Sequence, residues 1–217
     1  MPIEQCRAEA VSARILPTLY EVAAGHDLGT YPVEPLLTFR ARFSTLRVDR
    51  GCLAEAMRWR WGRWNSIEAL TATESALVAE LDAAWAAFVD SGTAAEPAPT
   101  FDWWAARRDT RADFFTIAWL THLVHHRCGW PLVGRHAFRA MHQLLHETRG
   151  HGAPPPSVPA PEPSTRADVE RLSTFVQALL ERMPGVERDT LCRFLAVYGR
   201  ERVPRPAAPA DGTRRAD

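Results

Sequence analysis

Apolar residues recur along most of the chain at intervals of three and four positions, which is the period of one face of an α-helix. The clearest stripe consists of Leu77, Leu81, Trp85 and Phe88. It follows Thr71 and Glu74, whose spacing is that of a capping box, and it stops before Gly92. The pattern predicts a helix over residues 71–92.

Similar stripes predict further helices over residues 2–25, 110–128, 135–148, 167–183 and 187–198. The helix at 110–128 is expected to open with a second capping box, formed by Thr110 and Asp113. Residues 94–100, "AAEPAPT", are interpreted as a short linker. Strict alternation of apolar and polar residues is scarce, so the sequence predicts an all-α fold.

A proline-rich stretch divides the chain. Six prolines lie between Pro154 and Pro163, and such a segment is an extended spacer of about 3.1 Å per residue. We therefore expect a helical core domain at 1–149, a linker at 150–166, a C-terminal helical pair at 167–200 and a disordered tail at 201–217.

Residues 58–65, "RWRWGRWN", place three arginines and three tryptophans within eight positions. If a helix runs through them, its apolar stripe comprises Leu53, Met57, Trp61 and Trp64. The tryptophans would then pack into the core and leave Arg58, Arg60 and Arg63 facing outward. These arginines are candidates for phosphate contacts and equally for ion pairs with the acidic helix at 66–90.

Charge is balanced overall, but its distribution is uneven. The 217 residues carry no net charge, and all 26 basic residues are arginine. The absence of lysine excludes a Schiff-base mechanism, a lysine general base and a Walker-type phosphate lysine. Two arginine-rich blocks, residues 36–65 and 103–150, flank the acidic block 66–102, an order that is compatible with a one-sided basic surface.

The four cysteines are widely separated and form no CxxC pair, which favours a reducing compartment over a disulfide framework. The first residues do not resemble a signal peptide, and the longest apolar run, Phe114–Val124, is too short to span a bilayer. We therefore expect a cytoplasmic protein with no membrane partner.

The segment "GWPLVGRHAFR", Gly129–Arg139, resembles the one that follows the hairpin in helix–hairpin–helix DNA glycosylases. The family pattern there is approximately G-x-P, a few apolar residues and V-D-T-H-V-x-R. The matching positions are Gly129, Pro131, Val133, His136 and Arg139. The preceding "FTIAWLTHLVHH" resembles the buried helix that leads into this segment, so the resemblance covers about residues 105–148.

The chain departs from the family pattern in three places. Gly134 occupies the position of the catalytic aspartate, and the lysine of the lyase branch is absent. Residues 103–113, where the hairpin is expected, contain no glycine. "MPGVERDTL", Met183–Leu191, matches the hairpin better but comes late in the chain and has Glu187 in place of a glycine, so we interpret it as a helix stop and restart.

The resemblance implies a DNA-binding protein that either removes a damaged or modified base without lyase activity or binds DNA without chemistry. It would place His136 near the reaction centre, with Asp113 (or its neighbour Asp109) as a replacement carboxylate unless Asp113 is simply a helix cap. Phosphate contacts are expected from Arg107, Arg108, Arg111, Arg135 and Arg139, besides Arg58, Arg60 and Arg63. A flipped base would stack on Trp103, Trp104 or Trp130, unless these residues pack in the core.

Two other hypotheses stay open. Five histidines lie at helical spacing, a pattern compatible with a metal site: His122, His125, His126, His142 and His146. The arginines around the last two disfavour a cation, so we expect no metal and no cofactor. A non-catalytic protein whose basic face binds an acidic protein partner is the other alternative, and the sequence leaves open both whether the chain is an enzyme and its oligomeric state.

Overall fold

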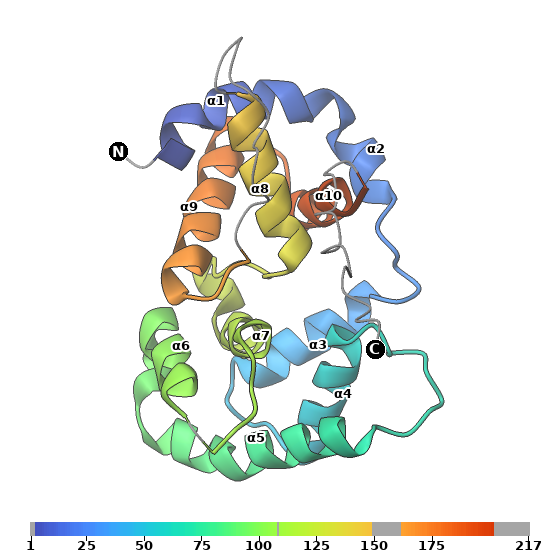
Figure 1. Ribbon diagram of the computed structural model, residues 1–217, viewed down its shortest axis with the longest axis vertical. Helices are drawn as coiled ribbons and strands as arrows, with labels where there is room; N and C mark the ends of the chain where they lie inside the picture. Colours follow the sequence, from blue (N-terminus) through green and yellow to red (C-terminus); the bar gives the residue numbers. More distant parts are fainter. Residues whose placement is uncertain (1–2, 108, 149–161, 202–217) are drawn as a thin grey trace, which may run out of the picture.

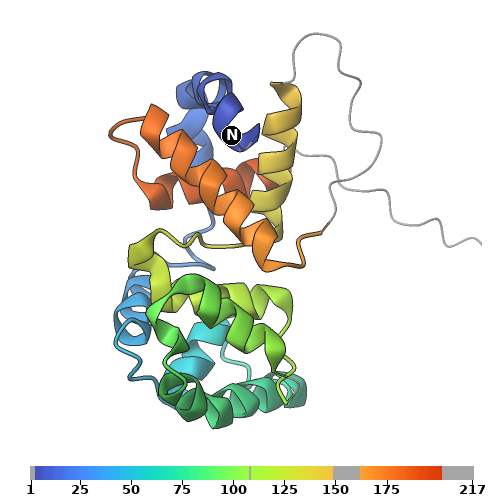
Figure 2. The same ribbon diagram turned by 90° about the vertical axis from the view of Figure 1, so that its left-hand side faces the viewer.

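The computed structural model describes residues 3–107, 109–148 and 162–201. In these ranges the chain forms α-helices and short 3-10 helices and no strand, which confirms the all-α fold. The helices form two groups that lie one above the other in Figures 1 and 2. The two groups are made from different parts of the chain, and we call them the terminal lobe and the central lobe.

The terminal lobe contains both ends of the described chain. Its helices are α1 (Ile3–Ile15), α2 (Leu19–Ala24), α8 (Arg135–Glu147), α9 (Arg166–Arg182) and α10 (Arg188–Glu201). The central lobe consists of α3 (Val33–Phe43), α4 (Arg50–Arg60), α5 (Ala72–Asp90), α6 (Pro97–Ala106) and α7 (Phe114–His125). Short 3-10 helices are η1 (Leu16–Thr18), η2 (Thr93–Ala95) and η3 (His126–Cys128).

The division of the chain differs from the one that the proline-rich stretch suggests. Helix α9 packs along α1, and α10 packs against α2 and α8, so the C-terminal pair belongs to the same lobe as the N-terminal helices. The N-terminal helices α1 and α2 thus pack against α9 and α10, which follow the proline-rich stretch, rather than against the central helices alone. Most of the expected linker (150–166) and nearly all of the expected tail (201–217) lie outside the described residues.

Side-chain caps set several helix starts. The capping box of Thr71 and Glu74 opens α5 as expected, one residue after Thr71. The box expected at Thr110 and Asp113 is wrong: α7 begins later, at Phe114, because Asp113 is its N-cap and accepts from the Thr116 amide at 2.7 Å.

Prolines account for the two helices that the apolar pattern does not reveal. The N-cap of α3 is Pro32, and α6 starts at Pro97, inside the stretch interpreted as a linker. The first four amides of a helix have no partner within it, so proline costs little there and supplies a suitable φ. Pro17 acts in the opposite way: it interrupts the single helix expected at 2–25, which becomes α1, η1 and α2.

The "RWRWGRWN" stretch does not continue as a helix. Helix α4 ends at Arg60, and Gly62 takes a φ of +68°, a left-handed conformation that favours glycine. Because the helix ends at Arg60, a different tryptophan is buried from the one predicted. Trp59 is in the core, whereas Trp61 and Trp64 are only partly covered. The helical stripe predicted for this segment is therefore correct only up to Met57.

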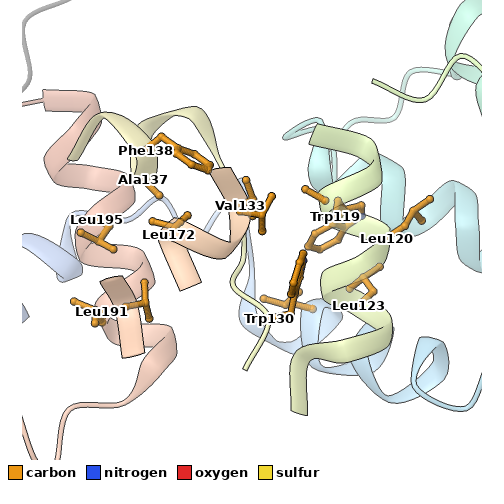
Figure 3. Packing of buried hydrophobic residues seen from close by; sticks show 14 of the residues in the cluster. Trp119, Leu120, Leu123, Trp130, Val133, Ala137, Phe138, Leu172, Leu191 and Leu195 are labelled. Carbon is orange, nitrogen blue, oxygen red and sulfur yellow. The ribbon is translucent and has the colours of Figure 1, made fainter. Parts of the chain in front are cut away.

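Buried apolar side chains fill both lobes and join them through one continuous core. Figure 3 shows Leu172, Leu191 and Leu195 among the helices of the terminal lobe, and Trp119 and Leu123 on α7 of the central lobe. Val133, in the segment that enters α8, lies on the side of the terminal lobe that faces Trp119. The placement of one lobe on the other is thus part of the core packing.

Helices α8 and α10 cross at unusually close range. A methyl group at Gly199 of α10 would overlap the carbonyl oxygen of His136 and lie 3.1 Å from the amide nitrogen of Ala140, both on α8. The clash is with main chain, which moves only if a whole helix moves. Gly199 is therefore required for the close crossing of α10 and α8.

We expect Gly199→Ala to lower the free energy of unfolding by about 3 kcal/mol or more, because the clash forces α10 away from α8. Urea denaturation of the full chain measures the change. Gly134→Ala is the matched control: a methyl group at that position would have no other atom within 4 Å, so its cost is expected to stay below about 1 kcal/mol. Equal stability of the two variants would contradict the close crossing described here.

Candidate functional site

One arginine joins the two lobes. Arg40 on α3 is almost wholly buried, with 7% of its surface exposed. Its Nη1 and Nη2 donate to the two carboxylate oxygens of Asp189 on α10, at 2.7 and 2.9 Å. Partial burial alone would raise the pKa of Asp189, but the hydrogen bonds and charge of Arg40 outweigh it and hold that pKa below its ordinary value. The pair is therefore ionised and bidentate.

His122 on α7 completes this connection. Its Nε2 accepts from Nε of Arg40 at 3.1 Å, so the ring proton is on Nδ1, which donates to the carbonyl of Trp130 at 2.8 Å. Burial, and then the charge of Arg40, lower the pKa of His122 to about 3. The imidazole is neutral, and both of its nitrogens have partners.

This network predicts a specific loss of stability in acid. The ordinary pKa of His122 is 6.5 and its folded pKa is about 3. Between these values the unfolded chain binds a proton that the folded protein does not, so the free energy of unfolding falls as pH falls from about 6.5, with a limiting slope of about 1.4 kcal/mol per pH unit.

Other groups also titrate in this range. Comparison with His122→Gln isolates the contribution of His122 to the pH dependence of the free energy of unfolding. Glutamine keeps an acceptor and a donor but does not titrate. We expect the stability advantage of the wild type over His122→Gln to shrink as pH falls from about 7 to about 5, measured by urea denaturation at each pH. A difference that stays constant or grows would show that His122 is not the buried neutral group described here.

A cleft of about 520 Å³ opens between the lobes beside the Arg40–Asp189 pair. The central lobe contributes side chains from α3, α4 and α7, and the terminal lobe contributes the start of α8 and one face of α10. That face consists of Asp189, Cys192, Arg193, Ala196, Val197 and Arg200. Their spacing of three and four residues directs them to the same side of α10, toward the cleft.

Aromatic rings line the central-lobe side of the cleft. Trp59 and Trp119 stack with centroids 5.0 Å apart and planes 6° apart, and Tyr31 meets Trp59 edge-on at 5.3 Å. The indole of Trp59 donates to the carbonyl of Pro32 at 2.9 Å, which fixes its plane. A mostly apolar cleft with ordered rings suits a flat aromatic ligand.

The charged residues of the cleft are three arginines and two carboxylates: Arg60, Arg193, Arg200, Glu187 and Asp189. Several already have partners within the protein: Arg60 pairs with Asp113, Arg200 with Glu201 and Asp189 with Arg40. Arg193 donates to the Thr190 hydroxyl at 3.1 Å and has no ion pair in the described part of the chain. Its charge lies close enough to Asp189 to help lower the pKa of that carboxyl.

His136, the proposed reaction-centre histidine, lies in the first turn of α8 and lines the cleft. Burial first, and then the charges of Arg139, Arg135 and Arg200, lower its pKa below the ordinary value. His136 is therefore neutral near pH 7.

Asp113, the proposed replacement carboxylate, is outside the lining of the cleft. It caps α7, and its Oδ1 also accepts from Arg60 at 2.9 Å. Burial would raise its pKa, but the hydrogen bonds of Thr116 and the charge of Arg60 lower it. The helix-cap interpretation of Asp113 is thus correct, while the carboxylates in the cleft, Glu187 and Asp189, are not the ones that the sequence suggested. Asp109 pairs with Arg107.

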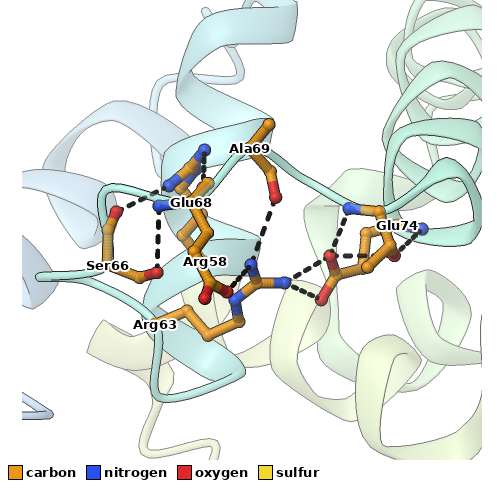
Figure 4. A network of polar contacts seen from close by, with 7 residues as sticks. Arg58, Arg63, Ser66, Glu68, Ala69 and Glu74 are labelled. Carbon is orange, nitrogen blue, oxygen red and sulfur yellow. Dashed lines mark hydrogen bonds and ion pairs between the residues drawn. The ribbon is translucent and has the colours of Figure 1, made fainter.

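Arg58 and Arg63 of "RWRWGRWN" bind to the segment that follows them, so they do not form an open basic surface. Arg63 donates to both carboxylate oxygens of Glu74 and to Glu68 and the carbonyl of Ala69, as Figure 4 shows. Arg58 donates to the carbonyls of residues 66 and 68. The alternative of ion pairs with the acidic segment is correct for Arg63, and neither side chain lines the cleft.

The other expected phosphate-binding arginines are in different surroundings. Arg107 pairs with Asp109 and lies over the ring of Trp103, and Arg111 pairs with Glu80. Arg135 is exposed, lies over the ring of Phe115 and has no ion pair in the described residues. Arg139 lies in the same helix, α8, and Arg108 falls outside the described residues.

The tryptophans expected to stack on a base are elsewhere. Trp104 is buried in the central lobe against Trp85 and Phe88, and Trp103 packs beside it. Trp130 is also buried, and all three are absent from the lining of the cleft. For these residues the core-packing alternative is correct.

Sequence reasoning missed the aromatic residues that do line the cleft, Trp59, Trp119 and Tyr31. Trp59 and Trp119 are 60 positions apart, and no local spacing connects them. Arg193 was missed because its helix is predicted to belong to a separate C-terminal helical pair. The useful signal was the spacing of Asp189, Arg193 and Arg200 on one face of a single helix.

The histidine pattern does not form a metal site among the described residues, where no three potential ligands gather. His122 is engaged at both nitrogens, and Nε2 of His125 lies 2.8 Å from the Thr100 hydroxyl. The described helices also include none with the length and apolar character needed to cross a bilayer.

Comparison of the chain with protein-family models, with curated proteins and with solved structures finds no match. The resemblance to helix–hairpin–helix glycosylases therefore rests on Gly129–Arg139 and the helix before it. The cleft between the lobes is the feature of the fold that is suited to bind a ligand.

Proposed function

We propose that this protein binds DNA across the two lobes and accommodates one unstacked base in the cleft between them. The observation that carries the proposal is the stacked pair Trp59–Trp119 in a mostly apolar cleft of about 520 Å³. Enzymes that act on a base extrude it into a pocket lined by aromatic and apolar side chains, and the cleft has this character.

Two arginines near the cleft support the choice of an anionic polymer. Arg193 lines it, Arg135 stands next to His136 at the start of α8, and neither has an ion pair in the described residues. In contrast, the guanidinium groups of Arg63, Arg107 and Arg111 are paired with carboxylates. Unpaired arginines that flank a pocket can contact phosphates while the base enters it.

The connection between α9 and α10 adds a second support. The Val186 amide donates to the carbonyl of Met183 at 3.1 Å across Pro184 and Gly185, and Gly185 has a φ of +89°. These are the features of a type II turn. The interpretation of this segment as a helix stop and restart is correct, and the resulting pair of helices joined by a tight turn has the form of the hairpin in the family that Gly129–Arg139 resembles.

Removal of the base is the further step that the resemblance implies, and it needs a carboxylate near the sugar. Asp189 is neutralised by Arg40, and Asp113 lies outside the cleft. Glu187 lines the cleft, is exposed and has no ion pair in the described residues. We assign this role to Glu187.

Arg193→Met tests the binding proposal, because it removes the charge and keeps much of the length of the side chain. With a duplex that carries one unpaired base, we expect affinity to fall and the slope of log K against log salt to decrease by about 1. Fluorescence anisotropy at several salt concentrations measures both. Arg111→Ala is the matched control, since this arginine is already paired with Glu80. Identical slopes for the wild type and Arg193→Met would contradict the proposal.

Base removal has its own assay. Duplexes with single modified bases are incubated with the protein and then treated with alkali, which cuts abasic sites. We expect cleavage with the wild type and a loss of at least about 100-fold in rate with Glu187→Gln, the size typical of a lost acid–base group. Cleavage that survives in Glu187→Gln would show that this assignment is wrong, and the absence of cleavage on every duplex would leave a DNA-binding protein without this chemistry.

A further inference from the structure

Two histidines and two arginines line the cleft together. We call them the basic cluster, and its members are His26, His136, Arg193 and Arg200. They come from three parts of the fold, namely the segment after α2, the first turn of α8 and one face of α10. Each of the four residues is partly exposed, so a ligand in the cleft can contact it.

Contacts with the main chain hold the three parts of the cluster together. Nη2 of Arg200 donates to the carbonyl of Gly25, the residue before His26, at 3.3 Å. Gly199, the residue before Arg200, lies against the carbonyl of His136 at the close crossing of α10 and α8. Arg200 is therefore next to both segments that carry the histidines.

The charges that surround His26 are mainly positive. Burial, and then the charges of Arg193 and Arg200, lower the pKa of this histidine. The carboxylate of Asp27 raises the pKa, but its effect is the smallest of the four. The ring of His26 is therefore uncharged near pH 7 and has two arginines close enough to act on it.

His136 has surroundings of the same kind. Burial lowers its pKa first, followed by the charges of Arg139 and Arg135 on its own helix and of Arg200 on α10. Arg200 thus acts on both histidines of the cluster. In the free protein the arginines keep both rings from taking up a proton near pH 7.

The carboxylates near the cluster neutralise only part of its charge. Both oxygens of Asp189 are bonded to Arg40. Glu201 pairs with Arg200 but is exposed, so water screens this pair. Glu187 precedes α10 whereas Arg200 lies in its last turn, so roughly 20 Å of helix separates the two residues. The end of the cleft at Arg200 is therefore suited to an anion.

A row of aromatic rings leads from the stacked tryptophans to the cluster. Trp59, which stacks on Trp119, meets Tyr31 edge-on with centroids 5.3 Å apart. The ring of His26 lies 5.9 Å from that of Tyr31. A nucleotide whose base lies against these rings can place its phosphate at the basic cluster.

We infer that the basic cluster binds the phosphate next to the unstacked base, and that its two histidines take up protons from solvent as the phosphate binds. A negative charge within about 4–6 Å favours the protonated form of a histidine. The protonated rings add charged donors for the phosphate oxygens to those of Arg193 and Arg200. This inference rests on the proposed DNA binding and specifies the phosphate subsite of the same cleft.

The affinity for DNA as a function of pH tests this inference. The probe is a duplex with one unpaired thymine, because neither thymine nor a phosphodiester titrates near neutral pH. The complex binds protons that the free protein does not, so affinity rises as pH falls. We expect an increase of about tenfold from about pH 8 to about pH 5.5, since each unit by which binding raises the pKa of one histidine is worth up to a factor of ten in affinity. Fluorescence anisotropy at constant salt measures it.

Glutamine variants identify the groups that take up the protons. We expect His26→Gln and His136→Gln each to reduce the pH dependence of the affinity, and the double variant to remove most of it. His126→Gln is the matched control, because His126 is also partly buried, with a pKa that burial lowers, but lies outside the lining of the cleft. This variant is expected to keep the pH dependence of the wild type. Thermal unfolding reports whether each variant is folded.

A modified duplex makes the same test with the wild-type protein. Methylphosphonate groups, which carry no charge, replace the two phosphates that flank the unpaired thymine. We expect the increase in affinity at low pH to be lost with this duplex, because no negative charge enters the basic cluster. Two methylphosphonates placed at one end of the duplex serve as the control and are expected to leave the increase unchanged.

The outcomes separate the two proposals. Salt-sensitive binding of the duplex with an affinity that does not change with pH would overturn the inference and keep the DNA-binding proposal. A pH dependence that persists in the double variant, or with methylphosphonates beside the thymine, would also overturn it, because the protons would then bind elsewhere. No binding of the duplex at any pH would overturn both proposals.

Discussion

The arrangement of the two lobes depends on the hydrogen bonds and the ion pair that the buried guanidinium of Arg40 makes. A cation in the interior is tolerated only when its hydrogen bonds and charge are matched, and loss of one partner typically costs about 3–5 kcal/mol. Asp189 supplies the charge from α10, and His122 supplies a neutral acceptor from α7. These partners belong to different lobes. Arg40 can bond to both of them only if α10 lies in a particular position relative to α3 and α7. The cleft lies beside this network, so its shape follows from the same requirement.

Helix α10 connects the stability of the fold with the character of the cleft. One side of it crosses α8 at Gly199, so closely that only a glycine fits. Another side presents Arg193 and Arg200 to the cleft, and Asp189 in its first turn holds Arg40. The requirement for Gly199 is steric and the requirement for Asp189 is electrostatic, but both act on the same rigid helix. The side chains of α10 that face the cleft are thereby held by contacts on its other faces.

The arginine-rich composition serves two purposes in this structure. Arg63 and Arg111 pair with Glu74 and Glu80, so the acidic block neutralises part of the two basic blocks that flank it, and Arg107 pairs with Asp109 inside its own block. This internal pairing explains why a chain with 26 arginines need not present a strongly basic surface. Arg193 lines the cleft and Arg135 lies beside it at the start of α8, and neither has an ion pair in the described residues. Whether the charge of an arginine is available to a ligand depends on whether a carboxylate of the protein already pairs with it.

Features that depend on neighbours along the chain can be predicted from the amino-acid sequence. The all-α fold, the capping box at Thr71, and helices α5, α8, α9 and α10 follow from periodicity and from side chains that bond to the backbone three residues away. Prolines were ambiguous, because Pro97 begins a helix while Pro17 interrupts one, and the outcome depends on what each helix packs against. His136, which the Gly129–Arg139 motif contains, lines the cleft. Tertiary structure alone decided that Arg63 pairs with Glu74, that Trp119 rather than Trp104 lines the cleft, and that Asp189 reaches Arg40 across 149 positions. Such contacts join residues whose separation in sequence carries no periodic signal, and the free energy that selects them comes from burial and charge pairing in the folded protein.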